Sequence, residues 1–224
     1  MTNRRLASIV EEWIQQGRPP QEAFNWEKSR KNWIRDIPTE RSFIENLSVE
    51  LSRGDLRAIR DLKKSKTSEI FVASMIWGYG DLGYGSYRVK KMFSTPGFRE
   101  KIDRSYELAS TGRVLDAYEF LSKNRIRQLG PAFGTKWLSF ASPSEEPAPI
   151  YDSFIALWVD KFAKQDFAGV TTSSGVWNTR TYGAYFEWIQ KNSVAFRVKP
   201  DDLELVIFQD ATMEFSARSK WIEL

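Results

Sequence analysis

Two residues of opposite charge, Lys136 and Asp152, lie in a stretch whose glycines and prolines predict two short helices. The stretch is LGPAFGTKWLSFASPSEEPAPIYDSF, residues 129–154. Glycine and proline near its start end one helical run, and we expect the next helix to open at Gly134, which places the lysine in its first turn. Asp152 precedes the apolar run SFIALWVDKF and is expected to cap that helix.

Both positions have chemical consequences. A helix N-terminus carries a partial positive charge that disfavours a protonated amine, so a lysine placed there and partly desolvated is a candidate nucleophile. The same dipole and the cap hydrogen bonds favour an ionised Asp152, which could stabilise a cationic transition state. The alternative is a solvated lysine and an ordinary capping aspartate, because both residue types are common at such positions.

A second segment, IWGYGDLGYGSYRVKK at residues 76–91, combines four glycines with aromatic and basic side chains. The spacing does not fit a dinucleotide fingerprint, because a helix and not a strand precedes it. Aromatic rings beside cations are typical of surfaces that stack bases and neutralise phosphates. The candidates for phosphate contact are Arg88, Lys90 and Lys91. The alternative is a glycine-rich turn whose tyrosines pack on the core.

Composition excludes several kinds of site. The chain has no cysteine, which rules out disulfides, thiolate metal sites and iron–sulfur clusters. It has no histidine, which rules out a Ser-His-Asp triad and histidine-ligated metals. The 33 basic and 29 acidic residues give a net charge of +4, which suits a nucleic-acid partner. No apolar run reaches the roughly 18 residues of a membrane span and no secretory signal opens the chain, so we expect a monomeric, cytoplasmic protein.

Helices must position these residues, since strand alternation is scarce. Apolar residues at helical spacing predict an amphipathic helix over 4–16. Further helices are predicted at 39–52, 55–63, 67–77, 85–94, 98–110, 113–121, 122–129, 135–142, 153–165, 179–192 and 201–209. The C-terminal segment 213–224 is predicted to be extended. We expect one integrated domain of two lobes, in which residues 1–65 match no motif and complete an N-terminal lobe.

The segment around the lysine resembles the helix-hairpin-helix DNA glycosylases, and within them the 8-oxoguanine DNA glycosylase branch. In that branch a Gly-Thr-Lys tripeptide ends the hairpin, its lysine attacks the sugar, and an aspartate shortly afterwards caps the next helix. Gly134, Thr135, Lys136 and Asp152 stand at those positions. Ala132 stands where the usual hairpin pattern has a glycine. The resemblance is specific over residues 129–158 and extends more weakly from about residue 66 to 210.

The resemblance implies an all-α, two-lobed fold with the active site in the cleft between the lobes. The glycosylase core would span residues 66–224, with the hairpin at 122–142. A phosphate of double-stranded DNA would be held by Pro131, Ala132, Phe133, Gly134 and Thr135. The target base must leave the duplex before it can be attacked. The candidates for its pocket are Trp77, Tyr79, Tyr84, Tyr87, Trp188 and Phe208.

The implied reaction is cleavage of the N-glycosidic bond, with Lys136 forming a Schiff base at C1′ and Asp152 stabilising positive charge. No metal or organic cofactor is needed. Short bacterial relatives of this branch include antiviral enzymes that excise hypermodified bases, and the glycine-rich segment leaves room for a bulky base. We therefore expect glucosylated hydroxymethylcytosine in phage DNA as substrate, with repair of oxidised purines and AP-lyase activity as the alternative. A non-catalytic helix-hairpin-helix DNA-binding module and a basic helical scaffold also remain open.

Overall fold

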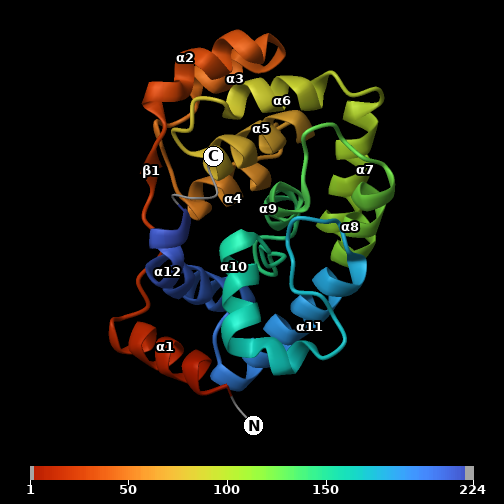
Figure 1. The fold of residues 1–224 in the computed structure, drawn as a ribbon. Helices are drawn as coiled ribbons and strands as arrows, with labels where there is room; N and C mark the ends of the chain where they lie inside the picture. The colour runs from red at the N-terminus through yellow and green to blue at the C-terminus, as the bar shows by residue number, and fades with distance from the viewer. Residues whose placement is uncertain (1–2, 220–224) are drawn as a thin grey trace.

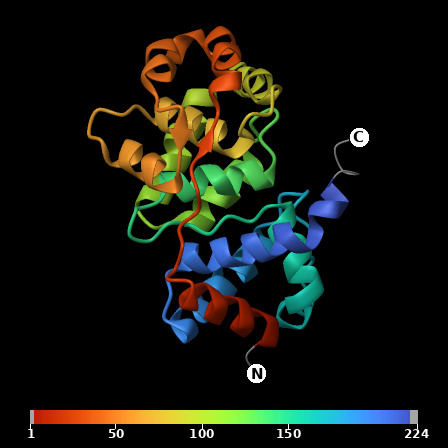
Figure 2. The same cartoon turned by 90° about the vertical axis from the view of Figure 1, so that its left-hand side faces the viewer.

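Helices dominate the chain, which confirms the all-α prediction. The computed structural model describes residues 3–219, with side chains over 3–215. Within these residues, strand structure is confined to β1 (Phe24–Asn25) and β2 (Glu50–Leu51), which pair antiparallel. Figures 1 and 2 show two groups of helices, one above the other, which we call the upper and lower lobes.

The upper lobe is built around one buried helix. Its helices are α2 (Glu27–Asp36), α3 (Arg41–Asn46), α4 (Arg53–Asp61), α5 (Thr67–Tyr79), α6 (Gly85–Phe93), α7 (Phe98–Ser110), α8 (Val114–Lys123) and α9 (Pro131–Ala141), with a 3₁₀ turn at Pro38–Glu40. Helix α5 is buried on nearly every face, as expected of a helix that is apolar all round. Trp137 of α9 packs edge-on against Phe71 of α5, with ring centroids 5.2 Å apart. These contacts fix α9 on the core.

The lower lobe contains α1 (Arg4–Gln15), α10 (Ser153–Trp158), α11 (Thr179–Phe196) and α12 (Pro200–Ser219). A π-helical turn at Val159–Ala163 and a 3₁₀ turn at Lys164–Phe167 follow α10. Asp210 of α12 is buried, and its carboxylate accepts hydrogen bonds from Arg5 of α1 and from the Trp158 indole. One carboxylate therefore joins three helices of this lobe.

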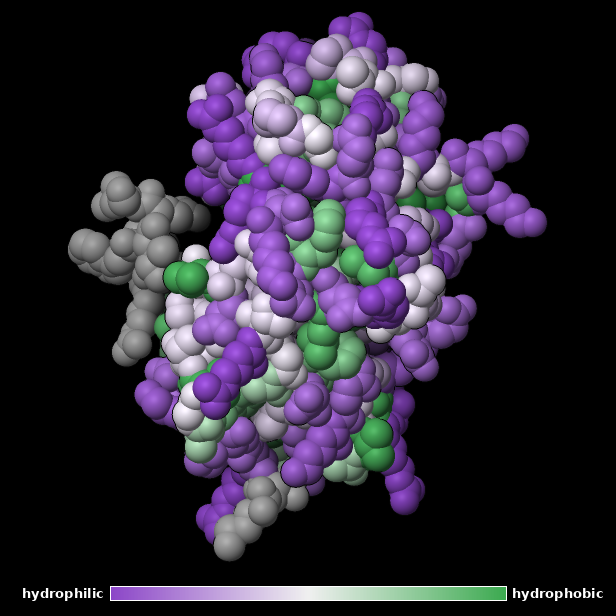
Figure 3. Space-filling model, turned by 90° about the vertical axis from the view of Figure 1, so that its right-hand side faces the viewer, coloured by the Kyte–Doolittle hydropathy of each residue, from purple (hydrophilic) through white to green (hydrophobic). Residues whose placement is uncertain are grey.

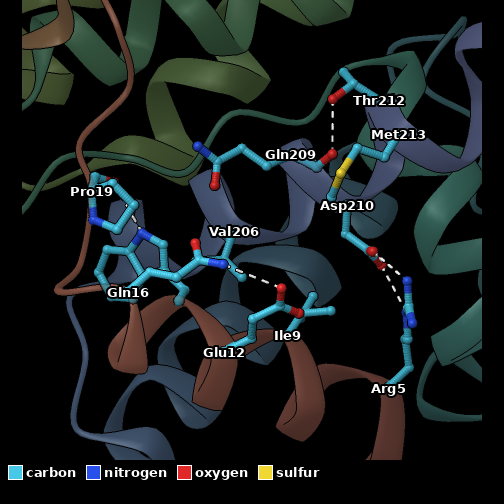
Figure 4. A pocket seen from close by; sticks show the side chains of 11 residues that line it. Arg5, Ile9, Glu12, Gln16, Pro19, Val206, Gln209, Asp210, Thr212 and Met213 are labelled. Carbon is cyan, nitrogen blue, oxygen red and sulfur yellow. Dashed lines mark hydrogen bonds and ion pairs between the residues drawn. The ribbon is translucent and has the colours of Figure 1, made fainter.

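Residues 1–65 contribute to both lobes. Helix α1 packs on α12, whereas α2, α3 and α4 pack in the upper lobe. The chain crosses between them in the extended segment before β1 (Figure 1). Helix α1 and α12 also border a groove of about 480 Å³, in which Arg5 points toward Asp210 (Figure 4).

Several predicted boundaries are wrong. The helix expected at 122–129 is absent: a turn follows α8, in which Gln128 has a φ of +69°. Helix α9 begins at Pro131, four residues earlier than expected, because proline is favoured at the first position of a helix. Helix α2 was not predicted, and the helix expected at 39–52 is reduced to a 3₁₀ turn and α3.

The C-terminal segment predicted to be extended is helical through Ser219, and residues 220–224 lie outside the described residues. Ile207, Ala211 and Phe215 are buried one turn apart, so packing on the lower-lobe core continues the helix. The face formed by α7, α8 and α11 is covered mainly by hydrophilic side chains, with hydrophobic ones grouped near its middle (Figure 3). Among residues 3–219, no helix is long and apolar enough to cross a membrane.

Candidate active site

The structure brings Lys136 and Asp152 together. The Nζ atom of Lys136 lies 3.1 Å from Oδ2 of Asp152, and the two side chains are only 14% and 9% exposed. The lysine comes from α9 of the upper lobe and the aspartate from the start of α10 in the lower lobe. The ion pair therefore lies where the two lobes meet.

Asp152 is the N-cap of α10, as predicted. Its Oδ1 accepts hydrogen bonds from the backbone N–H groups of Phe154 (3.1 Å) and Ile155 (3.2 Å), while Oδ2 faces the lysine. Two amides fix the position of this carboxylate at the positive end of the helix dipole. Oδ1 is thus occupied by the cap hydrogen bonds, whereas Oδ2 can interact with a positive charge that develops beside it.

The sequence predicts Lys136 in the first turn of its helix, and this prediction is wrong. Because α9 begins at Pro131, the lysine is in the second turn, where the helix dipole acts weakly. Its environment is set by packing: Nζ lies 5.3 Å from the centre of the Phe133 ring. A Cβ built on Gly78 would be 3.1 Å from Cδ of Lys136 and 2.9 Å from the Phe133 ring. The glycine therefore leaves space for the lysine side chain to run along α5.

Thr135 connects the two halves of the pair. Its buried hydroxyl accepts a hydrogen bond from the backbone N–H of Tyr151 at 3.0 Å, immediately before Asp152 in the chain. A threonine next to the lysine thus holds the backbone that leads into the aspartate. This explains physically why a Gly-Thr-Lys sequence suits the site.

The residues predicted to hold a DNA phosphate divide into two groups. Pro131, Gly134 and Thr135 are buried, and a Cβ on Gly134 would collide with the Trp177 indole, so these three support the turn from inside. Ala132 and Phe133 are half-buried. Their backbone N–H groups, at the first turn of α9, have no hydrogen-bond partner among the described residues. Free amides at a helix N-terminus are suited to bind a phosphate.

An aromatic run connects the glycine-rich segment to the lysine. Phe133 stacks on Tyr79 with ring centroids 4.0 Å apart, and Tyr79 packs edge-on against Tyr84 at 5.9 Å. Tyr79 is buried and burial raises the pKa of its hydroxyl, whereas Tyr84 is 49% exposed. Trp77 is also buried, and Tyr87 is exposed. The exposed tyrosines of this segment are therefore available to a ligand. Tyr79 packs against Tyr84, whereas Trp77 packs on Phe140.

Of the two pocket candidates near the C-terminus, one lies beside the site. The half-buried Phe208 packs edge-on against Phe154, in the first turn of the helix that Asp152 caps, with ring centroids 5.9 Å apart. Trp188 is buried in a different cluster, beside Trp158 and Phe167, and donates to Asp166. Phe154 thus adjoins Asp152 and Phe208 packs on Phe154, whereas the aromatic contacts of Trp188 lie in the other cluster.

The three basic candidates on α6 differ in environment. Arg88 lies over the Tyr84 ring at 5.1 Å and Lys91 over the Tyr87 ring at 5.2 Å. Lys90 lies 3.7 Å from the buried carboxylate of Asp36 and is partly neutralised by it. Arg88 and Lys91 form no salt bridge among the described residues, which leaves their charge available to a phosphate.

With this geometry established, comparison with known proteins identifies the family. The sequence model of the family described as "Putative 8-oxoguanine DNA glycosylase OGG-like protein" matches residues 17–208. The chain belongs to this OGG-like family. Comparisons with curated proteins and with solved structures give no match.

Membership of the OGG-like family indicates a DNA glycosylase that acts on DNA. The matched residues contain the whole of the lysine–aspartate site, whereas α1 precedes them. Helix α1 and the C-terminal part of α12 lie outside the matched residues.

Two charged residues beside the site were missed by the sequence analysis. Arg53, in the first turn of α4, and Glu204, in the first turns of α12, form a buried ion pair. Each had a signal in the sequence. Ser52 and Asp55 form a capping box that begins α4 at Arg53, and Glu204 interrupts the apolar run of residues 203–208.

Proposed function

We propose that this OGG-like protein flips a modified base out of duplex DNA and excises it with Lys136 as nucleophile and Asp152 as the stabilising anion. The observation that carries the proposal is the ion pair itself. A lysine amine lies 3.1 Å from a carboxylate that is fixed by two backbone amides, at the junction of two lobes. A carboxylate fixed in this way needs no reorganisation when positive charge develops beside it.

In the proposed reaction the C1′–N bond of the target nucleotide breaks, and the base leaves with the bonding electrons. Positive charge develops on C1′ and the ring oxygen, where Oδ2 of Asp152 opposes it. Lys136 first loses a proton, which the departing base can accept, and its lone pair then forms a bond to C1′. The C1′–O4′ bond then breaks, the attached ammonium passes a proton to O4′, and the C1′=N bond of a Schiff base forms. Loss of a C2′ proton would then break the C3′–O bond and release the 3′ phosphate. AP-lyase activity is thus a further part of the proposal.

The DNA would approach the N-terminal end of α9 and the exposed part of α6. The free amides of Ala132 and Phe133 support a phosphate contact there, and Arg88 and Lys91 support contacts to the backbone. Phe154 and Phe208 supply apolar faces beside Asp152, and we assign the base pocket to them and to Phe133. Tyr84 and Tyr87 would meet the duplex or the bulky part of the base.

For the substrate we propose glucosylated hydroxymethylcytosine in phage DNA, which would make the protein an antiviral enzyme. Support comes from the exposed hydroxyls of Tyr84 and Tyr87, which offer both stacking faces and hydrogen bonds to a sugar. Excision of 8-oxoguanine, the activity in the family's description, is the second candidate. A DNA-binding module without catalysis would use Lys136 only as a phosphate contact.

Three DNAs distinguish these candidates: glucosylated phage DNA, the same DNA without glucose, and a duplex containing 8-oxoguanine. Abasic sites should form in the glucosylated DNA with the wild-type protein and fail to form with Asp152→Asn. Excision confined to 8-oxoguanine would replace the antiviral substrate with the repair substrate. Salt-dependent binding with no excision from any duplex would support a binding module.

A further inference from the structure

A buried ion pair links the two lobes behind the proposed catalytic pair. Arg53 donates to both carboxylate oxygens of Glu204, at 2.7 and 3.0 Å, and the two side chains are 10% and 1% exposed. The Nε atom of Arg53 also donates to Gln21, at 2.7 Å. Burying two charges is costly, and it is stabilising only when their geometry and hydrogen bonds are good. A pair held by three hydrogen bonds meets that condition.

The Arg53–Glu204 ion pair is connected to residues that pack beside Lys136 and Asp152. The Arg53 guanidinium lies over the Trp77 ring at 5.4 Å, and the next residue, Gly78, packs against the aliphatic part of Lys136. Glu204 lies one helical turn before Phe208, which packs on Phe154 beside Asp152. Arg53 is thus linked to Lys136 through α5, and Glu204 is linked to Asp152 through α12 and Phe154; both charges also interact with that of Asp152.

We propose that Arg53 and Glu204 are positioning residues that hold the walls of the site and keep the charge around Lys136 and Asp152 balanced. The inference rests on the proposed roles of those two residues. Its distinctive consequence concerns charge. If Glu204 is neutralised, Arg53 becomes an uncompensated cation near the Lys136–Asp152 pair, since its charge interacts with that of Asp152, and the amine should become neutral at a lower pH.

The other ionisable groups near the site do not account for such a shift. Burial raises the pKa of both Tyr79 and Tyr185, so these phenols stay protonated. Arg57 and Asp201 are paired with each other between the same two helices. Burial raises the pKa of the Glu204 carboxyl, and the neighbouring Arg53 charge lowers it in part. Burial opposes the charged form of Arg53, yet Glu204 raises the pKa of the guanidinium. Without Glu204 the arginine stays charged, because a guanidinium keeps its proton throughout the pH range of the assay and because Asp201 and Asp152 also favour its charged form.

Three variants test the proposal by borohydride trapping on a duplex that already contains an abasic site. Schiff-base formation needs the neutral amine, so the trapping rate rises with pH to a plateau. In Glu204→Gln the pH of half-maximal trapping should fall by about one unit. In Gln21→Glu, which adds a carboxylate beside Arg53 at a half-buried position, it should rise. In the double variant Arg53→Gln/Glu204→Gln it should return toward the wild-type value.

A second readout needs no DNA: reductive methylation of Lys136 at a series of pH values, followed by mass spectrometry. It should show the same shifts, so a failed catalytic assignment and a failed positioning role are distinguishable. Arg5→Gln is the matched control, because it removes the salt bridge to the buried Asp210 of α12 and adds no charge near the site. It should lower thermal stability and leave both pH profiles unchanged. Unchanged profiles in Glu204→Gln and Gln21→Glu, or a further shift in the double variant, would overturn the proposal.

Discussion

Asp152 has two roles that one substitution separates. In Asp152→Asn the amide oxygen can still accept from the N–H groups of Phe154 and Ile155, but the negative charge opposite Lys136 is lost. The free energy of unfolding should therefore change by no more than about 1 kcal/mol. Excision should fall roughly 100-fold or more, because a preorganised charge in the transition state is missing. Urea unfolding and single-turnover excision measure the two effects.

An Asp152→Asn protein that loses stability but keeps its rate of excision would reduce Asp152 to a structural cap. Asp55→Asn is a useful control, because Asp55 belongs to a capping box on α4, in an exposed position. It should show a small loss of stability and an unchanged rate of excision.

At the residue scale, the sequence was most informative where local rules decide the outcome. Asp152 could be predicted as a cap, because an aspartate before an apolar run is a strong helix start signal. The position of Lys136 in its helix could not, because proline both ends a helical run and is favoured at the first position of a new helix, as Pro131 is in α9. Arg53 and Glu204 lie 151 positions apart in sequence and meet only through tertiary packing. No local pattern predicts that contact.

At the scale of elements, the contact between α9 and the loop before α11 depends on a missing side chain. A Cβ on Gly134 would collide with the Trp177 ring, which also packs on Tyr118, with ring centroids 4.9 Å apart. Gly134→Ala should therefore lower the free energy of unfolding by about 1–3 kcal/mol, as overpacking does. It should also reduce borohydride trapping on abasic DNA, because the displaced Trp177 ring packs against α9, the helix that carries Lys136.

The matched change is Gly183→Ala in α11, where a Cβ would have nothing within 4 Å. Alanine favours helix over glycine, so this variant should be neutral or more stable by up to about 1 kcal/mol. Equal losses of stability in the two alanine variants, measured by urea unfolding, would show that the Trp177 contact does not decide the result.

The boundaries of elements show where sequence rules compete. The run after α8 reads as helical, but a turn with a left-handed Gln128 replaces it, because Pro131 starts a new helix and the residue before a proline is biased away from helical backbone. The C-terminal part of α12 contains residues of mixed preference and becomes helical through burial of Ala211 and Phe215. Tertiary packing decided both outcomes.

At the scale of the whole molecule, α1 supports the lower lobe although it precedes the residues that match the family model. Leu6 of α1 is fully buried, and the helix packs on α12. Leu6→Ala should lower the free energy of unfolding by about 3 kcal/mol through lost burial and a cavity. Trapping per folded molecule should be unchanged, because α1 does not contact the ion pair.

Ser8→Ala is the control for Leu6→Ala, since Ser8 is exposed on the same helix. It should change neither stability nor trapping. A Leu6→Ala protein that is fully folded at the assay temperature yet inactive would show that α1 contributes to the reaction and not only to the fold.

The central claim is that Lys136 is the nucleophile, and borohydride trapping on abasic DNA tests it most directly. Lys136→Gln removes the amine and leaves an amide near Asp152. The wild-type protein should form a covalent adduct with the abasic duplex, and Lys136→Gln should form none while binding the same duplex with similar affinity. A covalent adduct with Lys136→Gln would mean that another amine attacks the sugar, with Lys123, Lys161 and Lys164 as the first to test, and would contradict the account.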